Sequence, residues 1–286
     1  MATKIEYLDE TWNPITGCSP ISEGCTHCWA KIMAHRFPAI HGYYQEFDGD
    51  YHGWEPAEFK HVRFHPERLD QPLKWKKPRR IGVCFMGDLF HKNVKPDWIY
   101  DILATMYKAQ QHIYLILTKR PELLLKDHEP RIEDAWGGWP HCAWLGVTVE
   151  NENNLWRIEE LLKITAAKYF GSFEPLLGPI DLSPWLGGFI CDGCGKEMVP
   201  RSTTHEIFYN SVDRFPELCG HVIERPCLDW AIVGGETGPG ARPMNPDWAR
   251  SIADQCRAAG VPFFFKKMGG NRPTPPDLMI REFPEC

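Results

Sequence analysis

Short apolar runs followed by polar clusters recur along this chain of 286 residues. The clearest runs are IGVCFM at 81–86, IYLILT at 113–118, CAWLGVTV at 142–149, KYFGSF at 168–173, DWAIV at 229–233 and VPFFF at 261–265. Continuous apolar runs of this length are typical of strands buried on both faces of a parallel sheet. A further strand is expected near Glu6–Thr16.

Amphipathic segments separate several of these strands. Asp97–Gln110 has apolar residues at positions 98, 99, 102, 103, 106 and 107, which fits one face of a helix. Asn153–Ala166 and Pro246–Ala259 show similar patterns, and Asn245 and Gly260 are the expected caps of the second. Strands that alternate with helices predict a parallel α/β fold. We expect a partial or full (β/α) barrel of the TIM type, with about six to seven β/α units. An open doubly wound sheet is the alternative.

Charged side chains follow the apolar runs one after another. In a barrel the carboxyl ends of the strands meet at one rim, where functional residues lie. The expected rim residues are Asp88, His91, Lys119, Arg120, Glu150, Glu174, Glu236 and Lys266. Because loops are polar in any protein, a single one of these residues means little, and it is the whole series that predicts a functional rim. For His91 we expect packing rather than catalysis.

Two long segments interrupt the alternation. Residues 38–78 form a connection rich in aromatic residues, histidine and proline, and residues 184–228 separate two strands and carry their own cysteines. Connections this long within a domain are usually functional or form a small subdomain. We therefore predict a barrel made of residues 1–183 and 229–286, with a cysteine-rich insertion at 184–228.

Composition and charge narrow the class of protein. The chain is 43% hydrophobic and 24% charged, as is typical of globular proteins. Its net charge of −6 provides no overall attraction to nucleic acid or to anionic membranes. The basic stretch from Lys74 to Arg80 is a candidate local patch, although a solvated loop is the simpler interpretation. The sequence shows neither a signal peptide nor a run of membrane-spanning length, so we expect a cytoplasmic protein without a membrane partner.

The first group of cysteines is Cys18, Cys25 and Cys28, in GCSPISEGCTHCWA. It follows the first expected strand and precedes an expected helix over Cys28–Phe37. Three thiolates can hold three irons of a [4Fe–4S] cluster and leave the fourth iron open to a substrate or cofactor. The alternatives are a structural zinc site completed by His27 or a distant ligand, and buried inert thiols.

The second group lies in the insertion and has the spacing C-x2-C-x24-C-x7-C. Its members are Cys191, Cys194, Cys219 and Cys227. Four cysteines can close a tetrahedral zinc site, which would stabilise an insertion too small to fold alone. Structural zinc is therefore the prediction, and a second iron–sulfur cluster is the alternative.

Seven motifs carry a resemblance to a known family. In order they are TWNPITGC, MGDLFH, LTKRPELL, WLGVTVEN, SFEPLLGPI, VGGETGPGARPM and PFFFKKMGG. They resemble a phage and bacterial family of unknown function that is described by a three-cysteine motif, over about residues 10–270. That family is similar to the radical S-adenosylmethionine superfamily. The superfamily's common spacing is C-x3-C-x2-C, whereas the first gap here is six residues.

This resemblance implies that Cys18, Cys25 and Cys28 hold a [4Fe–4S] cluster whose open iron binds S-adenosylmethionine. One electron from the cluster then cleaves the sulfonium and gives a 5′-deoxyadenosyl radical. Asp88 is expected to accept from the amino group of S-adenosylmethionine, and Lys119 or Arg120 to pair with its carboxylate.

The remaining contacts to S-adenosylmethionine are expected from later strand ends. Glu150, Asn151 or Glu174 are expected to accept from the ribose hydroxyls. Gly234, Gly235 and Glu236 belong to a glycine-rich loop that would let backbone approach a flat ligand such as adenine. A tight turn before the next helix is the simpler interpretation of that loop.

The leading functional prediction is a radical S-adenosylmethionine enzyme with a separate electron donor. Its expected substrate is a nucleic-acid base or nucleotide, because phage contexts favour base modification and repair. One alternative is a zinc-dependent, non-radical metalloenzyme. The other is a nucleic-acid-binding protein scaffolded by metal, with the Lys74–Arg80 stretch and the insertion as its surface.

Overall fold

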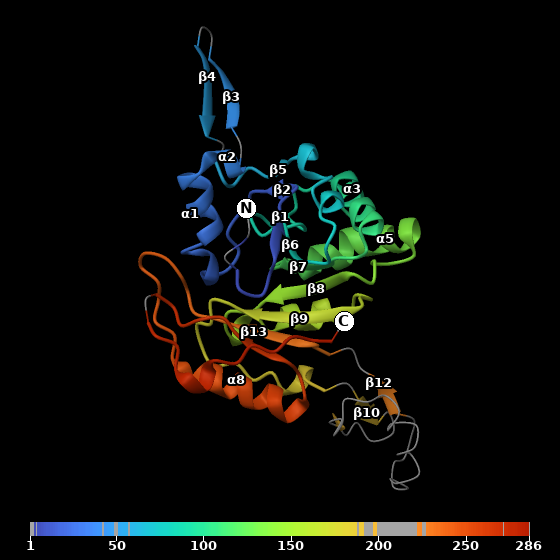
Figure 1. Ribbon diagram of the computed structural model, residues 1–286, viewed down its shortest axis with the longest axis vertical. Coiled ribbons are helices and arrows are strands. Elements are labelled where there is room, and N and C mark those ends of the chain that lie inside the picture. The colour runs from blue at the N-terminus through green and yellow to red at the C-terminus, as the bar shows by residue number, and fades with distance from the viewer. Residues whose placement is uncertain are drawn as a thin grey trace.

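Seven parallel strands form the central sheet of the protein. The computed structural model describes residues 3, 5–41, 43–48, 51–56, 58–187, 189–191, 197–198, 222–224, 227–270 and 272–285. The strands follow the order β1-β6-β7-β8-β9-β13-β14, and every neighbouring pair is parallel. The sheet curves into a half-barrel with helices on its outer side (Figure 1). The predicted partial (β/α) barrel is therefore confirmed.

The strands coincide closely with the apolar runs. They are β1 (Glu10–Trp12), β6 (Arg80–Val83), β7 (Ile113–Thr118), β8 (Ala143–Thr148), β9 (Lys168–Phe173), β13 (Trp230–Val233) and β14 (Phe263–Phe265). The run at 81–86 is the one cut short. Cys84 has a φ of 56°, in the left-handed region, so the chain leaves the strand there and bends toward the rim.

Helices connect the strands and cover the convex face of the sheet. They are α3 (Pro96–Lys108), α4 (Pro121–Leu123), α5 (Glu129–Trp136), α6 (Trp156–Leu161) and α8 (Pro246–Ala259), with a π-helical turn over Leu124–His128. For α8, Asn245 accepts from the backbone N–H of Asp247, and Gly260 ends the helix with a φ of 69°, as the capping pattern predicts.

Helix α6 is shorter than the predicted span of 153–166. A 3-10 turn over Glu152–Asn154 precedes it, and its end tightens because Ile164 N–H donates to the carbonyl of Leu161 rather than one residue earlier. The Tyr169 hydroxyl donates to the Ile164 carbonyl at 2.5 Å, which turns the chain directly into β9.

Large aromatic side chains fill the concave face of the half-barrel. Trp144, Phe170, Trp230 and Phe264 come from four adjacent strands and form one buried cluster with Tyr7. Alternate residues of a strand point to the same face. The inward positions nearer the carboxyl ends of the strands hold smaller side chains. Those positions include Leu117, Thr148 and Ser172, which line the pocket described below.

The amino-terminal segment brings the first cysteines to the rim. After β1 come β2 (Ile15–Thr16), a 3-10 turn (Glu23–Cys25), α1 (Trp29–Arg36) and α2 (Pro38–His41). Helix α1 begins after Cys28, close to the predicted start. The long connection that follows contains the hairpin of β3 (Tyr43–Asp48) and β4 (Tyr51–Pro56), and β5 (Arg63–Phe64), which pairs with β2. The hairpin projects beyond α2 (Figure 1).

The predicted insertion contains a separate small sheet. β10 (Phe189–Cys191) pairs with β11 (Glu197–Met198) and β12 (Val222–Glu224), both antiparallel. β12 leads to the amino end of β13, which is the end away from the rim (Figure 1). Before it, Trp185 and Leu186 still pack in the main core.

The second cysteine group lies largely outside the described residues. Cys194 and Cys219 are not described, and only the strand position of Cys191 is. Cys227 is described and partly buried. The zinc site of the insertion therefore stays a prediction. Among the described residues, no helix combines the length and the apolar character needed to cross a membrane.

Candidate active site

The three amino-terminal cysteines lie at the carboxyl edge of the half-barrel. Gly17 bridges in parallel to Gly87, with its N–H donating to the Met86 carbonyl at 2.9 Å, so the cysteine loop starts beside the end of β6. A Cβ on Gly87 would lie 2.9 Å from the Gly17 carbonyl oxygen, so this approach requires glycine. Cys18, Cys25 and Cys28 are partly buried, and all three line one pocket.

The same pocket gathers the polar ends of the other strands. The residues predicted for the rim or for S-adenosylmethionine that line it are Asp88, Lys119, Arg120, Glu174, Gly235, Glu236 and Lys266. Thr148 and Ser172 contribute the polar part of its floor. The pocket thus combines thiols, carboxylates and cations from most strands of the sheet.

A buried ion pair joins the end of β6 to the first cysteine. Arg120 Nη1 donates to Asp88 Oδ2 at 2.9 Å and to Cys18 Sγ at 3.3 Å, and Nη2 donates to the Ser19 carbonyl at 2.7 Å. Asp88 also accepts from the Thr118 hydroxyl at 2.7 Å and from two backbone N–H groups. All four lone-pair positions of this carboxylate are in use, so Asp88 holds the guanidinium in place.

Burial dominates the chemistry of the Cys18 thiol. Burial, with a contribution from Asp88, raises the pKa of Cys18 to about 11, although Arg120 opposes the shift. Metal binding deprotonates a coordinating thiol regardless of such a shift. His91 lies next to this group: its Nδ1 accepts from Asn93 N–H, so its Nε2 donates to the Ser19 hydroxyl at 2.8 Å. His91 is buried, and its contacts anchor the cysteine loop.

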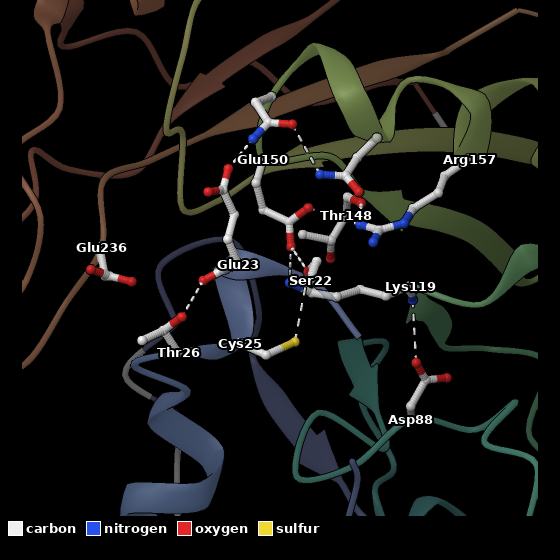
Figure 2. A network of polar contacts seen from close by, with 12 residues as sticks. Ser22, Glu23, Cys25, Thr26, Asp88, Lys119, Thr148, Glu150, Arg157 and Glu236 are labelled. Carbon is white, nitrogen blue, oxygen red and sulfur yellow. Dashed lines mark hydrogen bonds and ion pairs between the residues drawn. The ribbon is translucent and has the colours of Figure 1, made fainter. Parts of the chain in front are cut away.

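A second buried network joins the cysteine loop to the end of β8 (Figure 2). Glu150 is fully buried and pairs with Lys119 through Oε1 and with Arg157 Nη1 through Oε2, the latter at 2.8 Å. The Ser22 hydroxyl donates to Glu150 Oε1 at 2.6 Å. Burial raises the pKa of Glu150, but the two cations outweigh it and the net shift is downward. Glu150 is therefore an anchor of the loop in its ionised form.

The network also shapes the surroundings of Cys25. Its Sγ lies 3.7 Å from the Ser22 hydroxyl. Burial raises the pKa of Cys25, but Lys119 and nearby hydrogen bonds lower it by more, so the net shift is downward. Gly24 packs so closely on Glu150 that an added Cβ would lie 2.6 Å from the Glu150 Cγ. This explains why glycine precedes Cys25.

Glu236 forms a third group at the opposite wall of the pocket. It is buried, and it accepts from Arg242 Nη2 at 2.6 Å and from backbone N–H of the same residue at 2.9 Å. His27, in the cysteine loop, places Nδ1 2.9 Å from Glu236 Oε2. Burial raises the pKa of Glu236, but the hydrogen bonds from Arg242 and His27 lower it to about 2. A Cβ on Gly235 would lie 2.6 Å from the Gly269 Cα, so the two backbones touch here.

The other residues predicted to contact S-adenosylmethionine fall into two sets. Glu174 accepts from Lys266 Nζ at 2.5 Å, and both face the pocket. Asn151, Glu150 and Gly234 do not line it. The Asn151 side chain accepts from Asn153 N–H and contacts Glu23, so it caps the turn before α6. The assignments of all nine residues to S-adenosylmethionine stay predictions.

Several residues of these networks were missed by the sequence analysis. Ser22, His27 as a partner of Glu236, Arg157 and Arg242 each bond a strand-end carboxylate. Arg157 had a usable signal, because a charged residue interrupts the apolar face of the predicted helix. The basic stretch Lys74–Arg80 lies at the amino end of β6, away from the pocket.

A comparison with protein families shows which family the chain belongs to. A family described as "protein of unknown function (DUF5131)" matches residues 2–280. The chain belongs to this family. The match agrees with the predicted family of unknown function, whereas a comparison with curated proteins finds no match.

Two solved structures resemble the fold at low similarity. One is spore photoproduct lyase complexed with dinucleoside spore photoproduct, at 9% identity and a TM-score of 0.38. The other is a Tyr-to-Phe variant of spore photoproduct lyase, at 10% identity and the same TM-score. Each comparison covers 89% of this chain, which spans 62% of the length of the matched chain.

Proposed function

We propose that this protein is a radical S-adenosylmethionine enzyme with a [4Fe–4S] cluster on Cys18, Cys25 and Cys28. One observation carries the proposal: the three cysteines line the same pocket as the charged side chains that end the strands of a half-barrel. This is the edge where enzymes of parallel α/β folds hold their reacting groups. When bound, the cluster and S-adenosylmethionine supply a 5′-deoxyadenosyl radical.

The donor set at the cysteine loop fits a cluster. Among the residues that the structure describes, no three His, Cys, Asp or Glu side chains converge closely enough to hold one metal ion. A [4Fe–4S] cubane takes one thiolate on each of three irons and leaves the fourth iron open. Three thiolates in one pocket, with a cationic donor at one sulfur, are the ligand chemistry of iron–sulfur clusters.

S-Adenosylmethionine would occupy the pocket beside the cysteines. Its carboxylate would meet Lys119 or Arg120, which line the pocket with the three cysteines. Asp88 lines it too, and would accept from the amino group by exchanging one of its four present hydrogen bonds. Its ribose would face Glu174, because Glu150 and Asn151, the other predicted contacts, do not line the pocket. Its adenine would lie toward the glycine-rich loop, of which Gly235 and Glu236 line the pocket.

The proposed substrate is a nucleic-acid base or nucleotide. The resemblance to a phage and bacterial family favours it. A local surface beside the pocket, formed by Trp29, Arg36 and Phe37, also supports it, because it is cationic and aromatic. An electron donor is needed as well, because one-electron cleavage of the sulfonium consumes a reducing equivalent.

Anaerobic reconstitution with iron and sulfide tests the proposal. Wild-type protein is expected to take up about four irons, to turn brown, and to form 5′-deoxyadenosine when dithionite and S-adenosylmethionine are added. Cys18→Ala, Cys25→Ala and Cys28→Ala are each expected to abolish the product, while Cys142→Ala, a partly buried cysteine outside the pocket, is the matched control. Stoichiometric zinc at the three cysteines, without iron uptake, would instead indicate the zinc-dependent alternative.

A further inference from the structure

Exposed large apolar side chains concentrate around the cysteine loop. Eight large hydrophobic side chains are exposed in the described part of the chain, and four of them fall within residues 21–37. They are Ile21, Trp29, Ile32 and Phe37, with 45%, 42%, 42% and 44% of their surface exposed. Single exposed apolar residues are common, but a group beside a pocket marks a binding surface.

Helix geometry places the exposed residues of α1 side by side. Trp29 and Ile32 are three residues apart, and Ile32 and Arg36 four apart, so these side chains are neighbours on one face of the helix. The Arg36 guanidinium lies 5.3 Å from the centre of the Phe37 ring. The opposite face is fixed, because Ala30 and Ala34 are buried there. We call Trp29, Ile32, Arg36 and Phe37 the α1 rim surface.

The charge of α1 is opposite to that of the whole chain. The helix contains no acidic residue, whereas Lys31, His35 and Arg36 are all exposed. The chain as a whole carries a net charge of −6. A local cationic surface on an acidic protein selects a polyanion at this place and disfavours nonspecific contact elsewhere.

Trp29 occupies the border between solvent and pocket. It is exposed, and it also lines the pocket that holds Cys18, Cys25 and Cys28. A flat ring in that position can stack on a base that enters the pocket or on its neighbour in the strand. Arg36 is seven residues further on, two turns or roughly 10 Å along the helix, within reach of adjacent phosphates.

We propose that the α1 rim surface binds single-stranded nucleic acid, with a base stacked on Trp29 and backbone phosphates beside Arg36. The strand would present the nucleotide to be modified to the pocket. This inference rests on the proposed function for its reaction, but the binding itself requires no cofactor. An acidic electron-transfer protein would match the charges, yet it would leave unexplained why the exposed indole also faces the pocket.

The test is binding of a fluorescently labelled single-stranded oligonucleotide to the full-length protein, followed by anisotropy at several salt concentrations. Trp29→Ala is expected to raise the Kd roughly tenfold or more, because stacking contributes about 1–3 kcal/mol per base, and Trp29→Phe to retain most of the affinity. Arg36→Ala is expected to raise the Kd and to reduce the slope of log affinity against log salt by about 0.7.

Matched controls come from other surfaces of the chain. Trp156 is exposed on α6 and does not line the pocket, so Trp156→Ala is expected to bind as wild type does. The same holds for a Lys76→Ala, Lys77→Ala double variant at the opposite end of the sheet. Unchanged melting temperatures of all variants would show that they fold.

Three outcomes would overturn the inference. The first is an oligonucleotide affinity equal to that of wild type in both Trp29→Ala and Arg36→Ala. The second is loss of oligonucleotide binding in the Lys76, Lys77 double variant. The third is that Trp29→Ala and Arg36→Ala bind an acidic flavodoxin more weakly than wild type does but bind the oligonucleotide equally well. If wild type forms 5′-deoxyadenosine in any of these cases, only the surface assignment fails. If oligonucleotide binding behaves as expected but no cluster forms, only the proposed reaction fails.

Discussion

Arg120 is the side chain through which the protein would act most directly on a cluster. Its Nη1 donates both to Cys18 Sγ, at 3.3 Å, and to Asp88, at 2.9 Å. The guanidinium is buried. A cationic donor at a ligand sulfur stabilises the reduced, more negative state of a cluster more than the oxidised state. Removing this donor should therefore lower the reduction potential.

The magnitude follows from the contacts that are lost. A hydrogen bond to a charged group contributes about 1.5–3 kcal/mol. If the reduced cluster gains about 1.4 kcal/mol more from Arg120 than the oxidised cluster does, Arg120→Ala lowers the potential by about 60 mV, since a tenfold change corresponds to 59 mV for one electron. The variant should also lose about 3 kcal/mol of stability, because Asp88 would keep its three other donors but lose its countercharge.

The assay is a redox titration of the reconstituted protein followed by electron paramagnetic resonance of the reduced cluster. Arg120→Lys should recover part of the shift, because it keeps the charge but not the forked geometry. Arg257→Ala removes an exposed arginine of α8 and should leave the potential unchanged. Full iron content with a wild-type potential in Arg120→Ala would refute the reasoning.

Three further predictions concern the other networks of the site. Glu150→Gln should lower the free energy of unfolding by about 3–5 kcal/mol, because it leaves Lys119 and Arg157 without their countercharge. The control Asp254→Asn, at an exposed ion pair, should lower it by under about 1 kcal/mol, and thermal denaturation compares the two variants. The pKa of Glu236 is lowered to about 2 in the folded protein. The ionised carboxylate therefore contributes fully to the stability of the fold above its ordinary pKa of 4.5, and this contribution is lost as the pH falls toward 2. The stability difference between wild type and Glu236→Gln, on the order of 3 kcal/mol from denaturant titrations at neutral pH, should therefore shrink across that window, and a pH-independent difference would contradict the assignment. Gly24→Ala should reduce iron incorporation, because its Cβ would overlap with the Glu150 carboxylate, whereas Gly178→Ala has its nearest contact at 3.6 Å and should load normally.

The strands and their order along the chain could be predicted from the sequence alone. β7 and β9 have the bounds of their apolar runs, because a strand buried on both faces is apolar at most of its positions. Helix α8 has the predicted bounds because its caps, Asn245 and Gly260, are local signals. Such signals act over a few residues. Because they show where each parallel strand ends, they predict that Cys18 and the charged strand-end residues lie at one edge of the sheet.

The partners of those charges were decided by the tertiary structure. Arg120 bonds Cys18 across 102 positions, and His27 meets Glu236 across 209. No local pattern encodes such pairs, because they depend on strand order and on the curvature that brings the first and sixth strands of the sheet to one pocket. The sequence therefore determined which chemical groups stand at the rim. Only the fold decided that Asp88 and Glu150 anchor cations beside the cysteines, because burial forces each carboxylate to take its nearest available countercharge.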